Sequence, residues 1–194
     1  IGGKKVIVET QKYCEQSSGS CVVRCGETVV MVNVNMAKQP KAGIDFFPLS
    51  VDFEEKMYAV GKIPGGFKKR EGRPSDKAIL TSRLIDRPIR PLFPKDMRND
   101  VSVVATVMSV DPDCSPEIAA LWGVSTAIAI SDIPWDGPVS SVSLGLVDGK
   151  YVINPNLEER AKTEMTVTVA STDSLVAMIE AGANEISNEV MFDG

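Results

Sequence analysis

Alternation of polar and apolar residues predicts strands through the first third of the chain. Side chains two positions apart share one face of a strand, so this period gathers the apolar residues against a core. Gly26-Glu27 separates two such runs and is a two-residue turn of the kind that joins antiparallel strands. We expect strands at 4–9, 20–25, 28–35 and 46–53.

The middle of the chain predicts a buried strand followed by a buried helix. Residues 101–110 are rich in β-branched side chains, which favour strands. The segment Asp113–Pro116 then supplies cap residues and a proline suited to the first turn of a helix. The following residues, 117–130, are apolar on nearly every side, which is typical of a helix that packs against a sheet.

The last third predicts further strands. Asp148-Gly149 is the strongest hairpin dipeptide in the chain and lies between two apolar runs. The pattern of 174–183 fits either a strand or a short helix, and 184–190 fits a helix. We expect strands at 139–147, 151–153 and 165–170.

Another helix is predicted near Asp76–Asp86. Ser75 suits its N-cap, and Pro88 should end it at about Arg87 because proline lacks the backbone N–H that a helix interior needs. Arg90 would then project from a stiff extended segment between prolines. The apolar residues expected to face the core are Ile79, Leu80 and Leu84.

The order of these elements predicts an α+β fold, a mixed sheet packed with helices, because strands and helices do not alternate regularly. A length of 194 residues favours one domain over 1–194 rather than two. Hydrophobic content of 43% and charged content of 24% are ordinary for a soluble globular protein. No apolar run approaches the roughly 20 residues that span a bilayer, so we expect no membrane association.

The chain contains no histidine and four cysteines. Serine–histidine and cysteine–histidine hydrolase mechanisms are therefore excluded for this chain acting alone. The cysteines, at 14, 21, 25 and 114, form no CxxC pair. A metal site or disulfides are open interpretations, but buried free thiols in a reducing compartment are favoured.

Positive charge is concentrated in one segment of an acidic chain. The net charge is −5, yet 62–98 holds eleven cations and four anions and carries +7, which leaves −12 for the remainder. Arginine's planar fork suits bidentate phosphate contacts, and a Gly/Pro-flanked loop allows close approach to a ligand. Phe67 lies beside these cations and could stack a base while they hold phosphates. The segment therefore predicts a site for single-stranded nucleic acid.

Simpler interpretations stay open at this point. A charge run is often only a solvated face, or it binds an acidic protein. Arg83 and Arg87 are four apart and would share a helix face, where they could bind phosphate or pair with Asp86 and other acids. Four other acids match turn and cap positions rather than catalytic ones: Asp111, Asp113, Asp132 and Asp136.

Two blocks of the basic segment resemble a known family. "REGRPS" and "RLIDRPIRPLFP", within Gly43–Pro94, resemble the first RNase PH-like core of the polynucleotide phosphorylases. "SDIPWDGPV" and "VDGKYVINP" fit the same core in the same order, whereas 4–35 matches only in pattern and spacing. The resemblance implies an RNase PH-like fold (ribosomal protein S5 domain 2-like) and an N-terminal piece of a longer multidomain chain.

The resemblance also implies a function. Members degrade RNA from the 3′ end by phosphorolysis, releasing nucleoside diphosphates reversibly, in bacterial cytoplasm and as homotrimers that act in mRNA turnover. It implies that Arg83 and Arg87 support catalysis near the RNA 3′ end. The RNA-binding residues that it implies are Phe67, Lys68, Lys69, Arg70, Arg73, Arg83, Arg87 and Arg90.

Two departures from the family limit these implications. Lys68 stands where the family commonly has a second aromatic residue, so we expect a looser grip on bases and a steeper salt dependence. Inorganic phosphate and Mg²⁺ (or Mn²⁺) belong to a second RNase PH-like core, so we expect no metal or cofactor bound here and an inactive isolated chain. The alternative is a non-catalytic RNA-binding ring subunit of an exosome-like complex.

Overall fold

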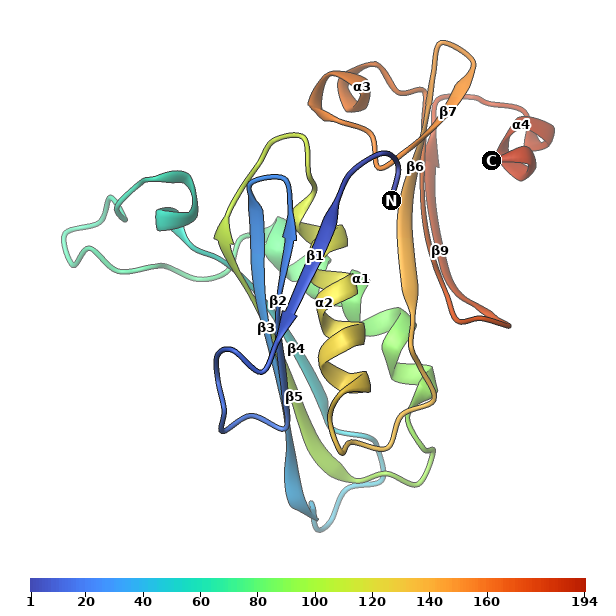
Figure 1. Cartoon of the computed structure of the whole chain (residues 1–194). Helices are drawn as coiled ribbons and strands as arrows, with labels where there is room; N and C mark the ends of the chain where they lie inside the picture. Colours follow the sequence, from blue (N-terminus) through green and yellow to red (C-terminus); the bar gives the residue numbers. More distant parts are fainter.

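The computed structural model describes residues 1–194 as two β-sheets with two long helices between them (Figure 1). The first sheet has the strand order β1-β2-β3-β5-β4, and the second has β7-β6-β8-β9. In Figure 1 the helices α1 and α2 fill the space between the first sheet, drawn in blue and green, and the second, drawn in orange and red. This α+β architecture confirms the fold class that the sequence predicts.

The first sheet is built from hairpins with one parallel edge. Its β2–β3 turn is Gly26-Glu27, where Cys25 pairs with Thr28, as the sequence predicts. β4 runs parallel to β5, and the connection between them contains the whole basic segment. The strands are β1 (Val6–Thr10), β2 (Gly19–Cys25), β3 (Thr28–Pro40), β4 (Leu49–Glu55) and β5 (Asn99–Ser109).

The second sheet is antiparallel throughout. The turn Asp148-Gly149 joins β6 to β7, as predicted, and the ambiguous stretch 174–183 forms a strand. The strands are β6 (Ser140–Val147), β7 (Lys150–Ile153), β8 (Met165–Ser171) and β9 (Val176–Ala183).

The main hydrophobic core lies between the first sheet and the two long helices. α2 (Pro116–Ala129) is buried on nearly every side, as its sequence predicts. It packs so closely on the sheet that a Cβ at Gly123 would lie 2.6 Å from Cγ2 of Val32. Trp122 of α2 reaches the second sheet, because its indole N–H donates to the carbonyl of Ser141 at 2.8 Å. The helix therefore connects both sheets.

Two expectations about α1 (Asp76–Ile89) are wrong. The helix does not stop at Arg87: it includes Pro88 and ends at Ile89, because a proline in the last turn removes only one hydrogen bond there. Its core face is also rotated from the one expected. Ile79 and Leu80 are exposed, whereas the half-buried Leu84 packs against the core as expected. The buried residues of the helix are Ala78, Thr81, Ile85, Pro88 and Ile89.

The shorter helices lie mainly at the edges of the fold. α3 (Leu157–Lys162) was not expected, although Asn156 and Glu159 form a capping box, a signal that the sequence contains. α4 (Asn188–Asp193) lies a few residues beyond the predicted 184–190. Two 3₁₀ helices are present: η1 (Met57–Val60) precedes the basic segment, and η2 (Arg90–Leu92) lies within it. No helix is long and apolar enough to cross a membrane.

Candidate nucleic-acid interface

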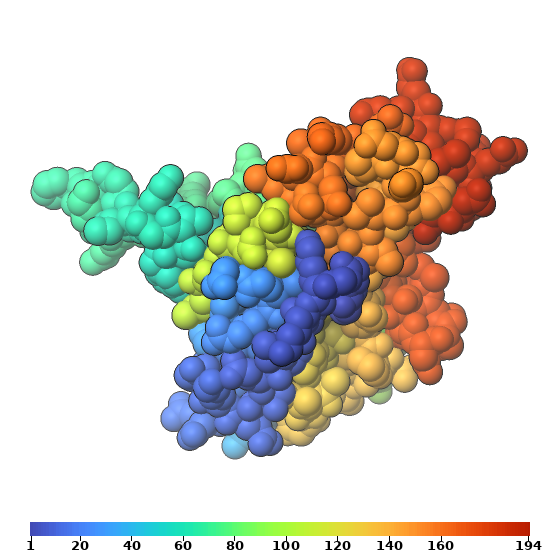
Figure 2. All heavy atoms as spheres, turned by 45° about the horizontal axis from the view of Figure 1, so that its top comes forward, coloured from blue at the N-terminus to red at the C-terminus, as the bar shows by residue number.

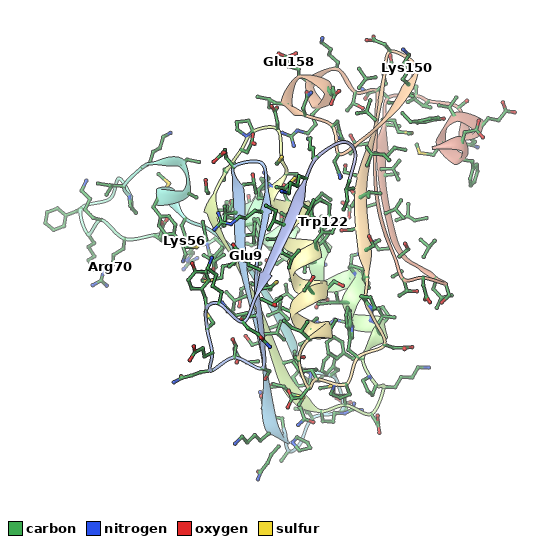
Figure 3. All side chains as sticks on the ribbon, in the orientation of Figure 1. Glu9, Lys56, Arg70, Trp122, Lys150 and Glu158 are labelled. Atoms are coloured by element: carbon green, nitrogen blue, oxygen red, sulfur yellow. The ribbon has the colours of Figure 1, made fainter.

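A long loop, Gly61–Pro74, projects from the body between η1 and α1; we call it the basic loop. Figure 2 shows it standing clear of the remaining atoms, and Figure 3 places Arg70 near its far end. A turn forms its tip, in which the N–H of Lys69 donates to the carbonyl of Gly66 at 2.9 Å. Phe67 at this tip is fully exposed. An aromatic ring without any packing partner is available to a ligand.

Acidic residues fix the base of the basic loop. The backbone N–H of Met57 donates to Oε1 of Glu71 at 2.9 Å, and the hydroxyl of Ser75 donates to Oε2 of Glu55 at 2.9 Å. Gly61 takes a left-handed conformation, with φ of 67°, where the chain leaves η1. These contacts hold both ends of the loop to the end of β4, while the tip stays free.

The cations of the basic loop are unpaired. Lys68, Lys69, Arg70 and Arg73 are all exposed, and their side chains make no ion pair or hydrogen bond within the chain. The only acid within the loop, Glu71, is held at the base by Met57. The loop therefore presents a local excess of positive charge that nothing in the chain neutralises.

A cleft of about 990 Å³ lies between the basic loop, β4 and α1. Arg70, Arg73 and Arg83 all line it, which brings the loop cations and one helix cation around a single space. Acids line the same cleft on the β4 and loop-base side: Asp52, Glu54, Glu55 and Glu71. Because Glu54, Glu55 and Glu71 are each hydrogen-bonded or paired within the chain, these carboxylates belong to the cleft's own structure.

The structure separates the two arginines of α1. Arg83 lines the cleft and has no partner in the chain. Nη1 of Arg87 instead lies 3.0 Å from Oε2 of Glu180 on β9, and both side chains are 56% exposed. The ion-pair interpretation therefore applies to Arg87, with an acid other than the Asp86 considered from sequence. Binding of RNA by either arginine stays a prediction.

Arg90 does not project from an extended segment, contrary to expectation, and its half-buried side chain is held within the chain. Its guanidinium donates to both carboxylate oxygens of Asp86, at 2.7 and 2.8 Å, and to the carbonyls of Phe47 and Leu49, at 3.3 and 3.1 Å. Residues 90–92 form a 3₁₀ turn rather than an extended segment, which points the side chain back to α1 and the start of β4. RNA binding by Arg90 stays a prediction, one that requires these bonds to break.

Among the acids that the sequence assigns to turns and caps, Asp111 has clear structural partners. Asp111 accepts from the N–H groups of Asp113 and Glu27, at 2.9 and 3.1 Å, and these two bonds, that from Asp113 first, lower the pKa of its carboxyl group. All four cysteines are free; three are buried, and Cys14 is exposed. No cluster of three or more Cys, Asp or Glu residues is arranged to hold a metal ion.

Family models describe the chain in two parts. One, the 3′ exoribonuclease family domain 1, matches residues 2–134, and the other, domain 2 of the same family, matches 137–194. Their boundary falls in the connector between α2 and β6. The expectation of a single domain over 1–194 stays a prediction.

Curated relatives match the chain from end to end. It is 62% identical over 193 residues to the polyribonucleotide nucleotidyltransferase of Clostridioides difficile (strain 630), and equally so to that of Ruminiclostridium cellulolyticum. These matches cover 100% of this chain and 28% of each relative. The chain therefore spans little more than a quarter of their length.

Solved structures share the fold. Rice (Oryza sativa) Rrp46 superposes with a TM-score of 0.77 at 15% identity, covering 98% of this chain and 85% of that one. The Archaeoglobus fulgidus exosome with RNA bound to its active site gives a TM-score of 0.74 at 21% identity, covering 99% and 83%. At these identities the likeness concerns the fold alone.

Proposed function

Because the chain belongs to the 3′ exoribonuclease family of RNase PH-like proteins, we propose that it is the first core of a phosphorolytic 3′-to-5′ exoribonuclease. The reaction cleaves RNA with inorganic phosphate into nucleoside diphosphates and is reversible. The observation that supports the proposal most directly is the cleft, which is lined by three unpaired arginines, Arg70, Arg73 and Arg83.

RNA enters along the basic loop. Phe67 stacks on a base, since it is fully exposed at the tip, and Lys68, Lys69 and Arg70 bind phosphates of the same strand. Lys69 and Arg70 are neighbours on a loop that is fixed only at its base, so the tip can follow a moving strand. Recognition through stacking and phosphates is independent of sequence, which a degradative enzyme requires.

Arg83 guides the strand toward its 3′ end. It lies on a helix rather than a loop, and a rigid support lowers the ordering cost of binding a phosphate. Displacement of a phosphodiester by phosphate needs positioning and charge neutralisation more than acid–base groups. A chain without histidine can serve this chemistry through arginines alone.

The remaining parts of the site lie in a second RNase PH-like core. In this proposal inorganic phosphate and Mg²⁺ (or Mn²⁺) bind in that second core. Ile79 and Leu80 are 47% and 65% exposed on α1, one turn from Arg83, which supports a partner surface beside the cleft. The full-length protein is a homotrimer of the bacterial cytoplasm in this proposal.

A second candidate function is a non-catalytic RNA-binding subunit of an exosome-like ring. The fold shared with exosome subunits supports it, but the 62% identity to polyribonucleotide nucleotidyltransferases favours the first proposal. The sequence encoded beyond Gly194 separates the two. A second RNase PH-like core there supports the enzyme, and a stop codon supports the ring subunit.

An activity assay tests the proposal. The purified chain is incubated with single-stranded RNA, phosphate and Mg²⁺, alone and with a separately purified second core from a close relative. We expect RNA binding by the chain alone, no release of nucleoside diphosphates, and release from the mixture. Release by the chain alone would place a complete active site within it, and failure to bind RNA would refute the role of the cleft.

A further inference from the structure

Two buried thiols touch each other at the end of the first sheet where β2 meets the turn before α2. Sγ of Cys25, at the end of β2, lies 3.3 Å from Sγ of Cys114, in the turn before α2. Their residues are 5% and 6% exposed and stand 89 positions apart in the sequence. The sulfurs of a disulfide lie about 2.0 Å apart, so the two thiols need to approach by only about 1 Å.

Thr28 holds both cysteines in one rigid frame. It pairs with Cys25 across the β2–β3 hairpin, and its hydroxyl donates to the carbonyl of Cys114 at 2.7 Å. The same hydroxyl accepts from the N–H of Asp111 at 2.8 Å. On the other side, a Cβ at Gly26 would lie 3.1 Å from the sulfur of Cys114. The two thiols are therefore kept in contact by the fold.

Small molecules can reach the pair. A cavity of about 190 Å³ between the two sheets is lined by Cys25, Cys114 and Trp122. Cys114 also lines a second cavity of about 630 Å³ on the side of η1. A water molecule occupies about 30 Å³ in the liquid, so a molecule as small as hydrogen peroxide fits in either space.

We propose that Cys25 and Cys114 form a reversible intramolecular disulfide when the protein meets hydrogen peroxide. The sulfur of Cys114, as thiolate, attacks one peroxide oxygen; the O–O bond breaks, and the leaving hydroxide takes up the thiol proton as water. The sulfur of Cys25 then attacks the resulting sulfenic acid, which forms the S–S bond, breaks the S–O bond and releases a second water. Two thiols are oxidised, and one peroxide is reduced to two waters.

The surroundings of the two thiols make their oxidation slow and favour the disulfide as its product. Burial, with the hydrogen bond from Cys25, raises the pKa of Cys114 to about 12, so the reactive thiolate is scarce at neutral pH. The pair therefore persists as thiols in a reducing cell and responds to sustained oxidation. The sulfenic acid, once formed, has Cys25 already in contact, which favours the disulfide over further oxidation.

Thiol counting in a Cys14→Ser background tests the proposal, because that change removes the exposed thiol. The folded protein is treated with hydrogen peroxide, quenched with catalase, denatured and alkylated with a mass tag. We expect the count to fall from three thiols to one, with a peptide linking 25 to 114 that dithiothreitol separates. The oxidised protein should melt about 5–10 °C higher, since a link across 89 residues restricts the unfolded chain.

Matched variants assign the link. Cys21→Ser in the same background should still form it, because Cys21 donates to the carbonyl of Gly123 rather than to a thiol. Cys114→Ser should form none. Three thiols retained after oxidation, a link that includes Cys21, or sulfinic acid in place of a disulfide would each overturn the proposal.

Discussion

Glu71 accepts a hydrogen bond from the backbone N–H of Met57 at 2.9 Å, and this contact holds the C-terminal part of the basic loop against η1, which precedes the loop. Glu71, the one acid of the loop, thus stabilises the part of the loop next to the protein body and does not neutralise the tip. The cations at the tip keep no internal partner and are free for a polyanion. This division of charge within one loop underlies the first two predictions.

Neutralising the tip should weaken RNA binding and its dependence on salt. In Lys68→Gln/Lys69→Gln/Arg70→Gln, we expect the slope of log K against log salt to become shallower by about 2, since each phosphate contact on a single strand contributes about 0.7. Fluorescence anisotropy with a labelled oligonucleotide measures it. The control removes three exposed lysines elsewhere, at 5, 150 and 162. Equal loss in both variants would show that net charge alone is responsible.

Phe67 should contribute through stacking, without any effect on stability. Because its ring is fully exposed, Phe67→Ala should leave the melting temperature unchanged. RNA affinity should fall about 5- to 150-fold, which corresponds to about 1–3 kcal/mol for one stacked base. Lys68→Phe should do the reverse: tighter binding with a salt slope shallower by about 0.7. Titrations at three salt concentrations separate the two effects, and unchanged affinity in Phe67→Ala contradicts the stacking role.

Arg83 and Arg87 should respond differently to the same substitution. Arg83→Gln should weaken RNA binding about 3- to 10-fold with no loss of stability, because this side chain lines the cleft without a partner. Arg87→Gln should change binding less than twofold in the isolated chain and cost at most about 1 kcal/mol, as expected for an exposed ion pair. Parallel binding and urea-unfolding curves test both. A larger binding defect in Arg87→Gln would show that Glu180 releases Arg87 to RNA.

Arg90 should matter for stability. Arg90→Lys loses the two-pronged contact with Asp86 and the hydrogen bonds that the guanidinium donates to the carbonyls of Phe47 and Leu49. Since the side chains of Arg90 and Asp86 are both partly exposed, we expect the free energy of unfolding to fall by only about 1–2 kcal/mol. This corresponds to a melting temperature lower by roughly 3–8 °C. Arg98→Lys is the control, because Arg98 donates only to nearby carbonyls. Equal melting temperatures for the two variants would contradict the structural role.

Glu117 should make the protein sensitive to acid. Burial alone would raise the pKa of its carboxyl group, but hydrogen bonds from Lys77 and Ser115 outweigh burial and lower it below the usual 4.5. A carboxyl group whose pKa is lower in the folded state stabilises fully above the unfolded pKa and loses this contribution as pH falls through the folded value. Glu117→Gln should therefore flatten the fall in unfolding free energy below about pH 4.5. Identical pH profiles would exclude this contribution.

Sequence alone predicted the fold where local chemistry decides it. The turns Gly26-Glu27 and Asp148-Gly149 and the apolar helix α2 were located correctly, since turn residues and uniform burial leave few alternatives. The face of α1 was misjudged, because Ile79 and Leu80 are apolar yet point away from the core. Hydrophobic character does not reveal which apolar face a partner outside the chain would cover.

At the candidate site, the sequence could not predict contacts between side chains that are far apart in the chain. The sequence located the basic loop and its cations, but not which arginines would find acids. Arg87 pairs with Glu180, 93 positions away, whereas Arg90 pairs with Asp86 four positions away and also donates to carbonyls more than 40 positions away. Spacing along a helix is compatible with the Arg90–Asp86 pair but cannot predict the distant contacts. The thiol pair Cys25–Cys114 likewise joins distant positions and had no local signal.

The parallel pairing of β4 with β5 affects how the basic loop between these strands can change in evolution. Everything proposed to touch RNA lies in the one crossover that joins these neighbouring strands, whose register is set by their own residues, Leu49 to Val101 onward. The loop can therefore change in sequence or length while the sheet stays intact, because doubling a flexible loop costs only about 0.6 kcal/mol in closure entropy. The basic loop, unlike the buried α1 in the same crossover, can therefore be replaced without disturbing the core, and substitutions such as Lys68 can change how a strand is bound without a new fold.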